Sequence, residues 1–419
     1  MKKIIAATAG LMLAGSIVAS ANAAKIDFGG DARARFNYRD NYQNAAKAAP
    51  QDTEESFWSS RVRLQFKIET KGGAYAVGRF RLADGTWDGS NNTAKNSTLA
   101  YGEKSNLFVD QAYVGVPIGP ITIEAGTGLN TMNEFLRADD AYDFVRAIYA
   151  NENAGTTVVA FMEKLDEYQE RTVSTTNPIT GLTTDSTVID DGYTNDDDVD
   201  QYGINLIQKF GGSWTMNGLV LYRNDQQADN DGLAADFLFS GKAGDISLFA
   251  EVGYKEADYQ GSDDDGYGGY VGARIPLGIA SISMIAGATS DGFTASGDFG
   301  GDGQDYAPFV MLSKANTEVL GMMNTGVLIG SAAGDSYFFH VAPSVKVSDK
   351  LTLTAEGTYM NADYAFTSGT RDLDIFEIGG IASYKVTEGA SLTALLGYLD
   401  IEDADENPLG FGLALDLKF

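Results

Sequence analysis

The last eleven residues, 409–419, alternate strictly between large apolar side chains and small or polar ones. The apolar set is Leu409, Phe411, Leu413, Leu415, Leu417 and Phe419, and the residues between are Gly410, Gly412, Ala414, Asp416 and Lys418. A side-chain period of two indicates a β-strand with one apolar face. The pattern recurs along the chain, with too few apolar residues to fill a conventional interior. We therefore predict a barrel whose apolar face meets lipid and whose polar face lines water.

The first 23 residues have the pattern of a cleaved secretory signal. Residues 1–3 are positively charged, 4–19 are mostly apolar and small, and 21–23 read Ala-Asn-Ala, a cleavage site of the A-x-A type. We expect a mature chain that starts at residue 24 and a single barrel domain over 24–419. Phe419 at the end of an alternating strand resembles the C-terminal assembly signal of bacterial outer-membrane proteins. That resemblance implies an integral location in the outer membrane.

Composition excludes several classes of protein. The chain has no cysteine, so disulfides and thiolate metal sites are excluded. Its formal net charge of −28 argues against a nucleic-acid partner, because such binding needs a basic surface. Beyond the signal there is no apolar run of about 18 residues, the length that a membrane-spanning helix requires.

The expected fold class is all-β, a transmembrane antiparallel barrel of about 18 strands. The strands are expected at 25–39, 57–70, 74–83, 106–116, 120–126, 142–150, 155–162, 201–210, 214–223, 232–241, 245–255, 266–275, 279–289, 336–347, 351–361, 373–386, 391–399 and 409–419. Counts of 16 and 20 stay open, because 306–335 forms either a further hairpin or a loop. Short turns such as Lys71-Gly72-Gly73 alternate with long acidic loops. This asymmetry is typical of outer-membrane barrels, which have short periplasmic turns and long outer loops.

Basic side chains gather on the expected inner face of the first three strands. They are Arg33, Arg35, Arg39, Arg61, Arg63, Lys67, Arg79 and Arg81. Charges this close repel unless water, anions or facing carboxylates screen them. The expected carboxylates are Glu134, Asp139, Asp140 and Asp143 near the segment 127–141, and Glu251, Glu356 and Glu377 on later strands. These groups either form a charged constriction in the pore or pair across the lumen as structural struts.

Two stretches resemble known families of barrel proteins. Asp110–Val116 followed by Gly119–Gly126 resembles the hairpin before the third outer loop of Gram-negative porins, in which that loop bends inward and its carboxylates face an arginine ladder. By this resemblance, 127–141 takes the place of the loop, and the arginines of the first three strands take the place of the ladder. The segment keeps Glu134-Phe135 of the usual Pro-Glu-Phe-Gly-Gly stretch. Phe28–Arg35 also resembles the first strand of alginate-export-type barrels, which have 18 strands and a basic lumen.

The leading functional hypothesis is a porin for passive diffusion of ions and small hydrophilic solutes. Opposed charge rows across a narrow wet opening orient polar solutes, and such diffusion needs no cofactor. The expected partners are outer-membrane lipid, lipopolysaccharide, the outer-membrane assembly machinery and the solutes themselves. Both a homotrimer and a monomer fit the sequence. The alternative is a barrel scaffold, sheath or adhesion protein without open-pore activity.

Two other features of the sequence suggest further sites. His340 is the only histidine, and alternation places it in the lumen. A hydrolase needs histidine beside an acid or a serine, so a lone lumen histidine does not make the chain an enzyme. The acidic loops at 190–200, 263–265 and 297–303 offer oxygen ligands suited to Ca²⁺. None has the EF-hand spacing, so solvated loops are the simpler interpretation.

Overall fold

In the computed structural model of the protein, part of the chain is described, and it includes every strand of the barrel. The described residues are 25–41, 54–87, 108–129, 132–133, 135–137, 141–166, 170–176, 183–189, 198–225, 231–260, 264–290, 293–295, 310–312, 335–366, 369–402 and 406–419. The predicted signal segment 1–23 lies outside them. Of the segment 306–335, only 310–312 and 335 are described.

Eighteen strands form one closed antiparallel sheet, which confirms the predicted fold class. The barrel strands are β1 (Lys25–Asp40), β2 (Glu55–Glu69), β3 (Tyr75–Thr86), β4 (Phe108–Ile118), β5 (Ile121–Leu129), β6 (Ala141–Asn151), β7 (Thr156–Asp166), β10 (Val199–Phe210), β11 (Trp214–Asp225), β12 (Gly232–Ala243), β13 (Ile246–Lys255), β14 (Gly266–Leu277), β15 (Ala280–Thr289), β16 (Ser336–Lys346), β17 (Leu351–Phe366), β18 (Gly369–Thr387), β19 (Ala390–Ile401) and β20 (Leu409–Lys418). Each strand pairs with the next along the chain, β7 pairs with β10, and β20 pairs with β1. The barrel therefore has no open edge.

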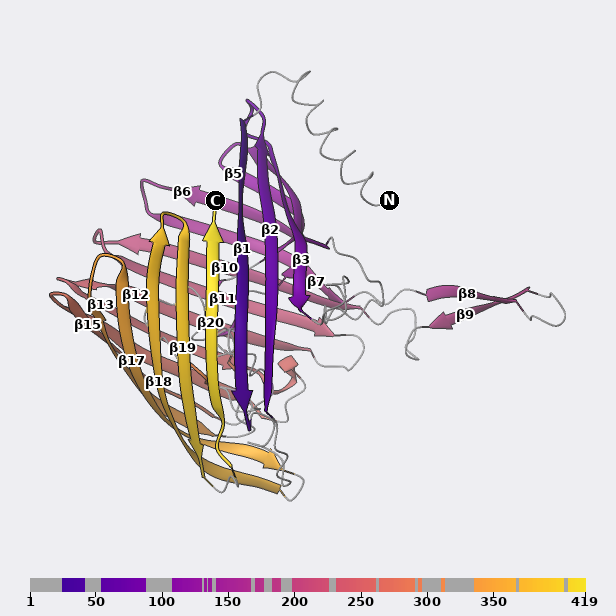
Figure 1. The fold of residues 1–419 in the computed structure, drawn as a ribbon. Coiled ribbons are helices and arrows are strands. Elements are labelled where there is room, and N and C mark those ends of the chain that lie inside the picture. Colours follow the sequence, from indigo (N-terminus) through magenta and orange to yellow (C-terminus); the bar gives the residue numbers. More distant parts are fainter. Residues whose placement is uncertain are drawn as a thin grey trace.

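Between β7 and β10 the chain forms a hairpin that the strand predictions did not contain. Its strands are β8 (Glu170–Thr176) and β9 (Thr183–Ile189), and they pair only with each other (Figure 1). Both strands are rich in threonine and valine, which favour extended backbone. One further short element is described, the 3-10 helix η2 (Ala257–Gln260) between β13 and β14. No helix among the described residues is long and apolar enough to cross a membrane.

Short turns join the strands at one end of the barrel, and longer connections lie at the other end (Figure 1). Glycines with positive φ occur in several turns, for example Gly73 at 82° and Gly389 at 75°, because a side chain strains that backbone conformation. β1 starts and β20 ends at the short-turn end. There Gly30 N donates to Phe419 O at 2.8 Å, and Phe419 N donates to Gly30 O at 3.1 Å. These two bonds fasten the last residue to the first strand.

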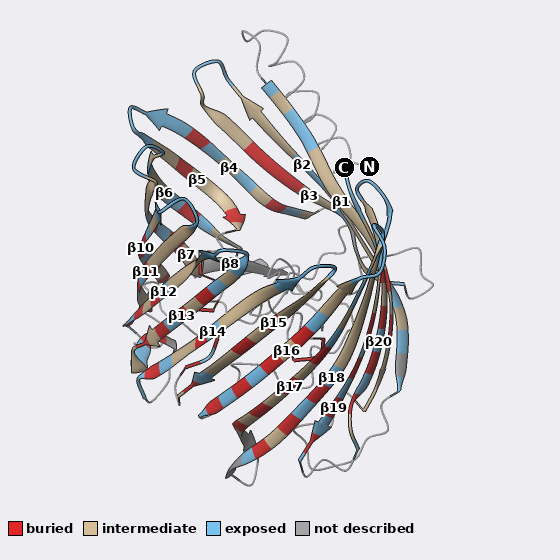
Figure 2. Ribbon diagram, turned by 90° about the vertical axis from the view of Figure 1, so that its left-hand side faces the viewer, coloured by how far each residue is buried: buried red, intermediate tan, exposed pale blue. Residues whose placement is uncertain are grey.

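Along the strands, exposed apolar side chains alternate with buried ones (Figure 2). On β16, Tyr337 and Phe339 are about half exposed, at 51% and 50%, whereas Phe338 and His340, which alternate with them, are buried. The exposed set faces outward, and the buried set faces the inside of the barrel. A row of outward Leu, Ile, Val and aromatic side chains is the surface that a lipid bilayer covers. The fold is therefore that of a membrane-spanning barrel.

Candidate functional site

The inner face of β1, β2 and β3 carries the predicted basic side chains. Arg33 lies directly opposite Arg61, and Arg63 lies directly opposite Arg81. Like charges in directly opposed positions destabilise a sheet, because their Cβ atoms are only about 5 Å apart. This part of the wall therefore needs anions close to it. We call the arginines at positions 33, 35, 61, 63, 79 and 81 the basic strip.

Asp31 is the first anion within the basic strip. Arg63 Nε donates to Asp31 Oδ2 at 2.8 Å, and Arg61 Nη2 lies 3.8 Å from Asp31 Oδ1. These side chains are partly exposed, at 20% for Arg63, 14% for Arg61 and 24% for Asp31. Two guanidinium groups thus approach one carboxylate here, and Asp84 of β3 lies directly opposite Arg61.

Asp110 on β4 holds the other pair of arginines in the same way. Arg79 Nε and Arg81 Nε each donate at 2.8 Å, one to each oxygen of the carboxylate. Asp110 is almost fully buried, at 3% side-chain exposure, while Arg81 reaches 29%. The Asp110 carboxylate is thus more deeply buried than the Arg81 guanidinium group, which is the more exposed of the two.

The other four predicted cations lie on the same strands in different surroundings. Arg35 is 4% exposed. Arg33 lies opposite Asp416 of β20. The guanidinium of Arg39 lies 5.1 Å from the Phe57 ring centroid, and Lys67 Nζ lies 4.4 Å from the Tyr75 ring centroid and 3.5 Å from Glu69. Arg39 and Lys67 are therefore held by neighbours outside the two aspartate-centred groups.

Of the segment 127–141, residues 132–133 and 135–137 contact the inner wall of the barrel, whereas 127–129 and 141 belong to β5 and β6. Asn133 Nδ2 donates to Asp236 Oδ1 on β12 at 2.5 Å, and Phe135 N donates to Glu251 Oε1 on β13 at 3.0 Å. β13 is half of the ring away from β2. The segment 132–137 therefore attaches to the wall that faces the basic strip, and it narrows the lumen from that side.

Arg137, at the end of this inner segment, forms a buried ion pair that the sequence analysis did not predict. Its Nη1 lies 2.5 Å from Glu163 Oε2 on β7, and both side chains are essentially unexposed. The guanidinium also lies over the rings of Tyr142, at 5.0 Å, and Phe161, at 5.7 Å. Alternation along 155–162 marks the next inward position as Glu163, which was the available signal for this pair.

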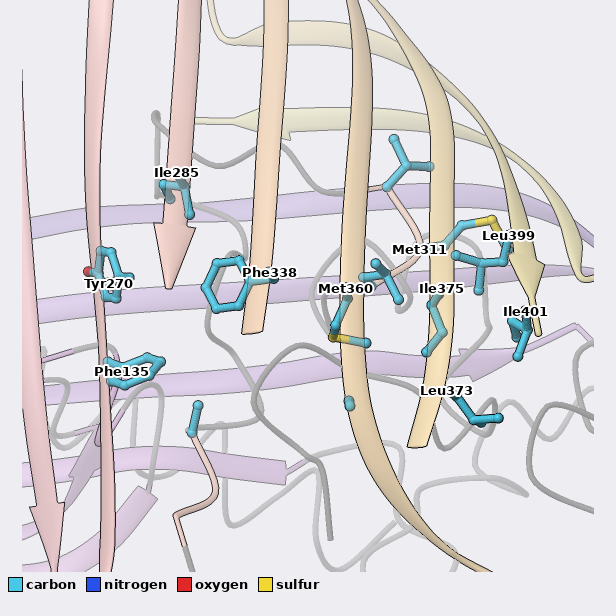
Figure 3. Packing of buried hydrophobic residues seen from close by; sticks show 14 of the residues in the cluster. Phe135, Tyr270, Ile285, Met311, Phe338, Met360, Leu373, Ile375, Leu399 and Ile401 are labelled. Carbon is cyan, nitrogen blue, oxygen red and sulfur yellow. The ribbon is translucent and has the colours of Figure 1, made fainter. Parts of the chain in front are cut away.

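A second segment, 310–312, also lies against the inner wall, and all three of its residues are buried. Figure 3 shows Met311 beside Leu399, and Phe135 of the first segment beside Tyr270. These side chains belong to one apolar cluster that runs over the inner faces of β13–β20. Phe293 belongs to it and stacks on Phe135 with ring centroids 5.1 Å apart. Part of the inner face is thus apolar and covered by chain segments, whereas alternation alone predicted a polar, water-lined face.

The predicted acidic residues are placed in three different ways. Glu251, Glu356 and Glu377 are on the inner wall but buried, at 0%, 4% and 1% exposure, beneath the two inner segments. Asp143 is exposed near the long-loop end and accepts a hydrogen bond from Thr127 Oγ1. Glu134, Asp139 and Asp140 lie outside the described residues. Asp31 and Asp110 are carboxylates that touch the basic strip. In the sequence, both occupy inward positions on strands that carry the arginines or neighbour them, and this pattern could have identified them.

The other sequence-predicted features lie away from this opening. His340 is buried, with Nδ1 2.8 Å from Thr358 Oγ1. Of the acidic loop at 190–200, Asp198 and Asp200 are described, and both pair with Lys164 Nζ, at 2.7 and 3.1 Å. Among the described residues, no cluster of acidic or histidine side chains has the arrangement of a metal site. The expected assembly signal, Phe419, is 66% exposed at the short-turn end.

Comparison with known proteins shows which structures share this fold. No family model and no curated protein matches the chain. Among solved structures, OccK8 (OprE) of Pseudomonas aeruginosa has a TM-score of 0.56 and 13% identity, over 94% of this chain and 98% of that one. OccAB4 of Acinetobacter baumannii and OpdK of P. aeruginosa with vanillate each have a TM-score of 0.58 and 13% identity, over the same shares. The chain therefore has the barrel fold of these outer-membrane channel proteins.

Proposed function

We propose that the protein is an outer-membrane channel for passive diffusion of ions and small hydrophilic solutes, and that the basic strip gives it a preference for anions. The observation that carries the proposal is the pair of arginine–aspartate groups, each with two cations on one carboxylate and each partly exposed to the lumen. The inner segment 132–137 stands across from them. A solute that crosses the barrel passes between these two walls.

The electrostatics of the opening follow from this arrangement. Fixed guanidinium groups attract an anion that has lost part of its water, and their planar donors match a carboxylate or phosphate. The carboxylates behind them limit the attraction, so that an anion is drawn in without being held. Conduction requires this balance, because a solute that binds tightly does not leave. The channel then needs neither an energy source nor a cofactor.

One of the structural neighbours supports an organic anion as solute. OpdK was crystallised with vanillate, which is a small carboxylate. On this chain the groups suited to such an anion are the arginines at 61, 63, 79 and 81. We further propose that residues 1–23 are removed on export, because β1 begins at Lys25, directly after the predicted cleavage site. The mature N-terminus can be checked by sequencing the protein purified from membranes.

The test of the channel is ion selectivity in planar lipid bilayers. We expect the native protein to give stepwise conductance and an anion-to-cation permeability ratio above one. The variant Arg61→Ser, Arg63→Ser, Arg79→Ser should lower that ratio several-fold. A matched variant, Lys346→Ser, Lys350→Ser, Lys385→Ser, removes the same charge at the exposed short-turn end and should leave the ratio unchanged.

Two outcomes would contradict the proposal in different ways. An unchanged ratio in the arginine variant would remove the basic strip as the selectivity element while leaving the channel. A folded protein without conductance would favour the alternative function, a barrel that serves as scaffold or sheath. The segments packed inside the barrel make that second outcome a real alternative, because they reduce the width of the lumen.

A further inference from the structure

Two pairs of acidic side chains on the inner wall share one construction. Asp236 on β12 and Glu251 on β13 occupy diagonal positions on neighbouring strands, and Asp236 lies directly opposite Gly253. Both side chains are directed to the same inner face of the barrel by the alternation of their strands. They are buried, at 4% and 0% exposure. A side chain at Gly253 would come within 3.2 Å of Asp236 Oδ2, so the glycine leaves space for the contact.

Glu356 on β17 and Glu377 on β18 repeat this arrangement. They are also diagonal neighbours, and Glu356 lies directly opposite Gly379. Their side chains lie on the same inner face and are 4% and 1% exposed. A Cβ atom at Gly379 would overlap with Glu356 Oε1. The same device therefore occurs twice in the barrel, on strands that are not neighbours.

Each pair holds one of the inner segments through the backbone of that segment. Glu251 Oε1 accepts from Phe135 N at 3.0 Å, and its Oε2 accepts from Tyr270 Oη at 2.5 Å. Glu377 Oε1 accepts from Val310 N at 3.0 Å and also from Met311 N. In each pair, one acid holds the backbone of the segment. Of the second acids, Asp236 accepts from the Asn133 side chain of its segment, and Glu356 accepts from Thr358 of the wall.

Three buried carboxyl oxygens in these pairs lack a donor if every acid is ionised. They are Asp236 Oδ2, Glu356 Oε1 and Glu377 Oε2. Two carboxylates cannot hydrogen-bond to each other, because both only accept, whereas a protonated carboxyl group donates one hydrogen bond. One proton on Asp236 and one on Glu356 supply the missing donors. Two like charges in buried contact are otherwise strongly unfavourable.

The groups around the pairs do not replace this proton. Around the first pair, Tyr270 of β14 donates a hydrogen bond, Asn133 contributes a neutral amide, and Lys255 of β13 is turned to the Thr294 carbonyl and the Phe293 ring. Arg137 of the same segment pairs with Glu163.

Around the second pair, Thr358 Oγ1 donates to Glu356 Oε2 at 3.3 Å, and His340 Nδ1 lies 3.6 Å from the same oxygen. The side chains of Val310, Met311 and Leu312 that cover the pair are apolar. Among the described residues, His340 is the basic side chain nearest to this pair.

We propose that each pair binds one proton, and that the bound proton holds its inner segment against the barrel wall. When Asp236 or Glu356 releases its proton to water, two negative charges lie at diagonal positions of neighbouring strands in a buried part of the wall. The carboxylates then separate, and the acid that holds the segment loses its position. Because the attached state carries one more proton than the released state, release increases as the pH rises. This inference depends on the barrel and its inner segments and is independent of the solute preference proposed above.

The test uses cysteine labelling. Because the chain has no cysteine of its own, only the introduced thiol reacts. Met311→Cys places a thiol in the buried segment 310–312, and Asp349→Cys places one in a fully exposed turn. Both maleimide labelling rates rise with pH because the thiolate is the reacting form. Dividing one rate by the other removes this common pH dependence. The ratio should rise as the pH is raised, with a limiting slope of about tenfold per pH unit for one proton released.

The matched control is Glu356→Gln, whose amide donates to Glu377 and has no proton to lose. In that background the Met311→Cys labelling ratio should stay at its low-pH value.

The second pair is tested in the same way with Leu136→Cys, and Asp236→Asn is its control. If a variant of one pair fails to fold, the other pair still gives an independent measurement. A ratio independent of pH in both native pairs, or an equal rise with and without the amides, would overturn the proposal. A protein that gives no conductance in bilayers but shows the pH-dependent labelling would contradict the proposed channel function and support the proton-bound segments.

Discussion

One ion pair inside this barrel matches a single buried cation with a single buried anion. Arg137 and Glu163 are both buried, and their contact of 2.5 Å joins the inner segment 132–137 to β7. Glu163 also accepts a hydrogen bond from Gln201 Nε2 at 3.0 Å. Removing one partner from such a pair leaves the other charge in a medium that cannot solvate it. The pair therefore fixes the position of the segment more than it adds stability.

Glu163→Gln should lower the free energy of unfolding by about 3–5 kcal/mol, because the Arg137 guanidinium then lies buried without an anion. The double variant Arg137→Met, Glu163→Leu should recover most of this loss, because it replaces both charges with apolar groups. Urea unfolding in lipid vesicles, followed by tryptophan fluorescence, measures both. If the single variant were as stable as the native protein, the pair would not anchor the segment.

At the scale of one element, β10 has one face directed to lipid and one face directed to the lumen. Its outward side chains include Tyr202, Ile204 and Leu206, while Gln201 and Asn205 point inward and are buried. Leu206 lies midway between the outward aromatic residues Tyr202 and Phe210. Aromatic side chains mark the two membrane interfaces in such barrels, so Leu206 is expected near the middle of the bilayer.

Leu206→Arg should destabilise the barrel by about 2–4 kcal/mol, the cost of arginine on the lipid face near the midplane. Ile207→Arg is the matched control, because the next residue points to the lumen, and its effect should stay below about 1 kcal/mol. Heat-modifiability on gels and urea unfolding in vesicles give the two values. Equal costs at the two positions would mean that the faces of this strand are assigned incorrectly.

At the scale of the whole molecule, a strongly acidic chain carries a local basic wall. The formal net charge is −28, yet the six arginines of the basic strip lie together on β1–β3, with Asp31, Asp84, Asp110 and Asp416 among the neighbouring acids. Fields from groups on the pore wall dominate over distant ones, because salt screens charges beyond a Debye length of about 10 Å at 0.1 M. The selectivity of the pore is therefore expected to follow its wall and not the total charge.

The anion preference should accordingly fall as salt rises. At 1 M salt the Debye length is about 3 Å, so the strip acts only on ions in contact with it. Reversal potentials measured from about 0.1 M to about 1 M KCl should show the permeability ratio moving toward one. The variant Arg61→Ser, Arg63→Ser, Arg79→Ser should show a much flatter dependence. A ratio that is constant over this range would mean that fixed wall charges do not set the preference.

The strand pattern and the basic strip were both readable in the sequence, because each depends on a period of two. In an alternating strand such as 409–419, the sequence shows which residues lie on each face. A short turn then pairs that strand with the next one along the chain. Alternation also put Glu251 and Glu377 on the inner wall. It did not show that they are buried beneath other parts of the chain, nor that β8 and β9 form a hairpin within a loop.

What the sequence alone determined was therefore the barrel and the alternation of its strand residues between two faces, since these follow from local periodicity. The strand number was expected to be about 18, with 16 and 20 open, and the closed sheet has 18. Only the tertiary structure decided where the segments 132–137 and 310–312 attach. Their anchors, Asp236 with Glu251 and Glu356 with Glu377, are far from them along the chain. No periodicity links a backbone N–H to a carboxyl group more than 60 residues away. Such contacts arise from the closed shape of the barrel, which brings loop and wall together in three dimensions.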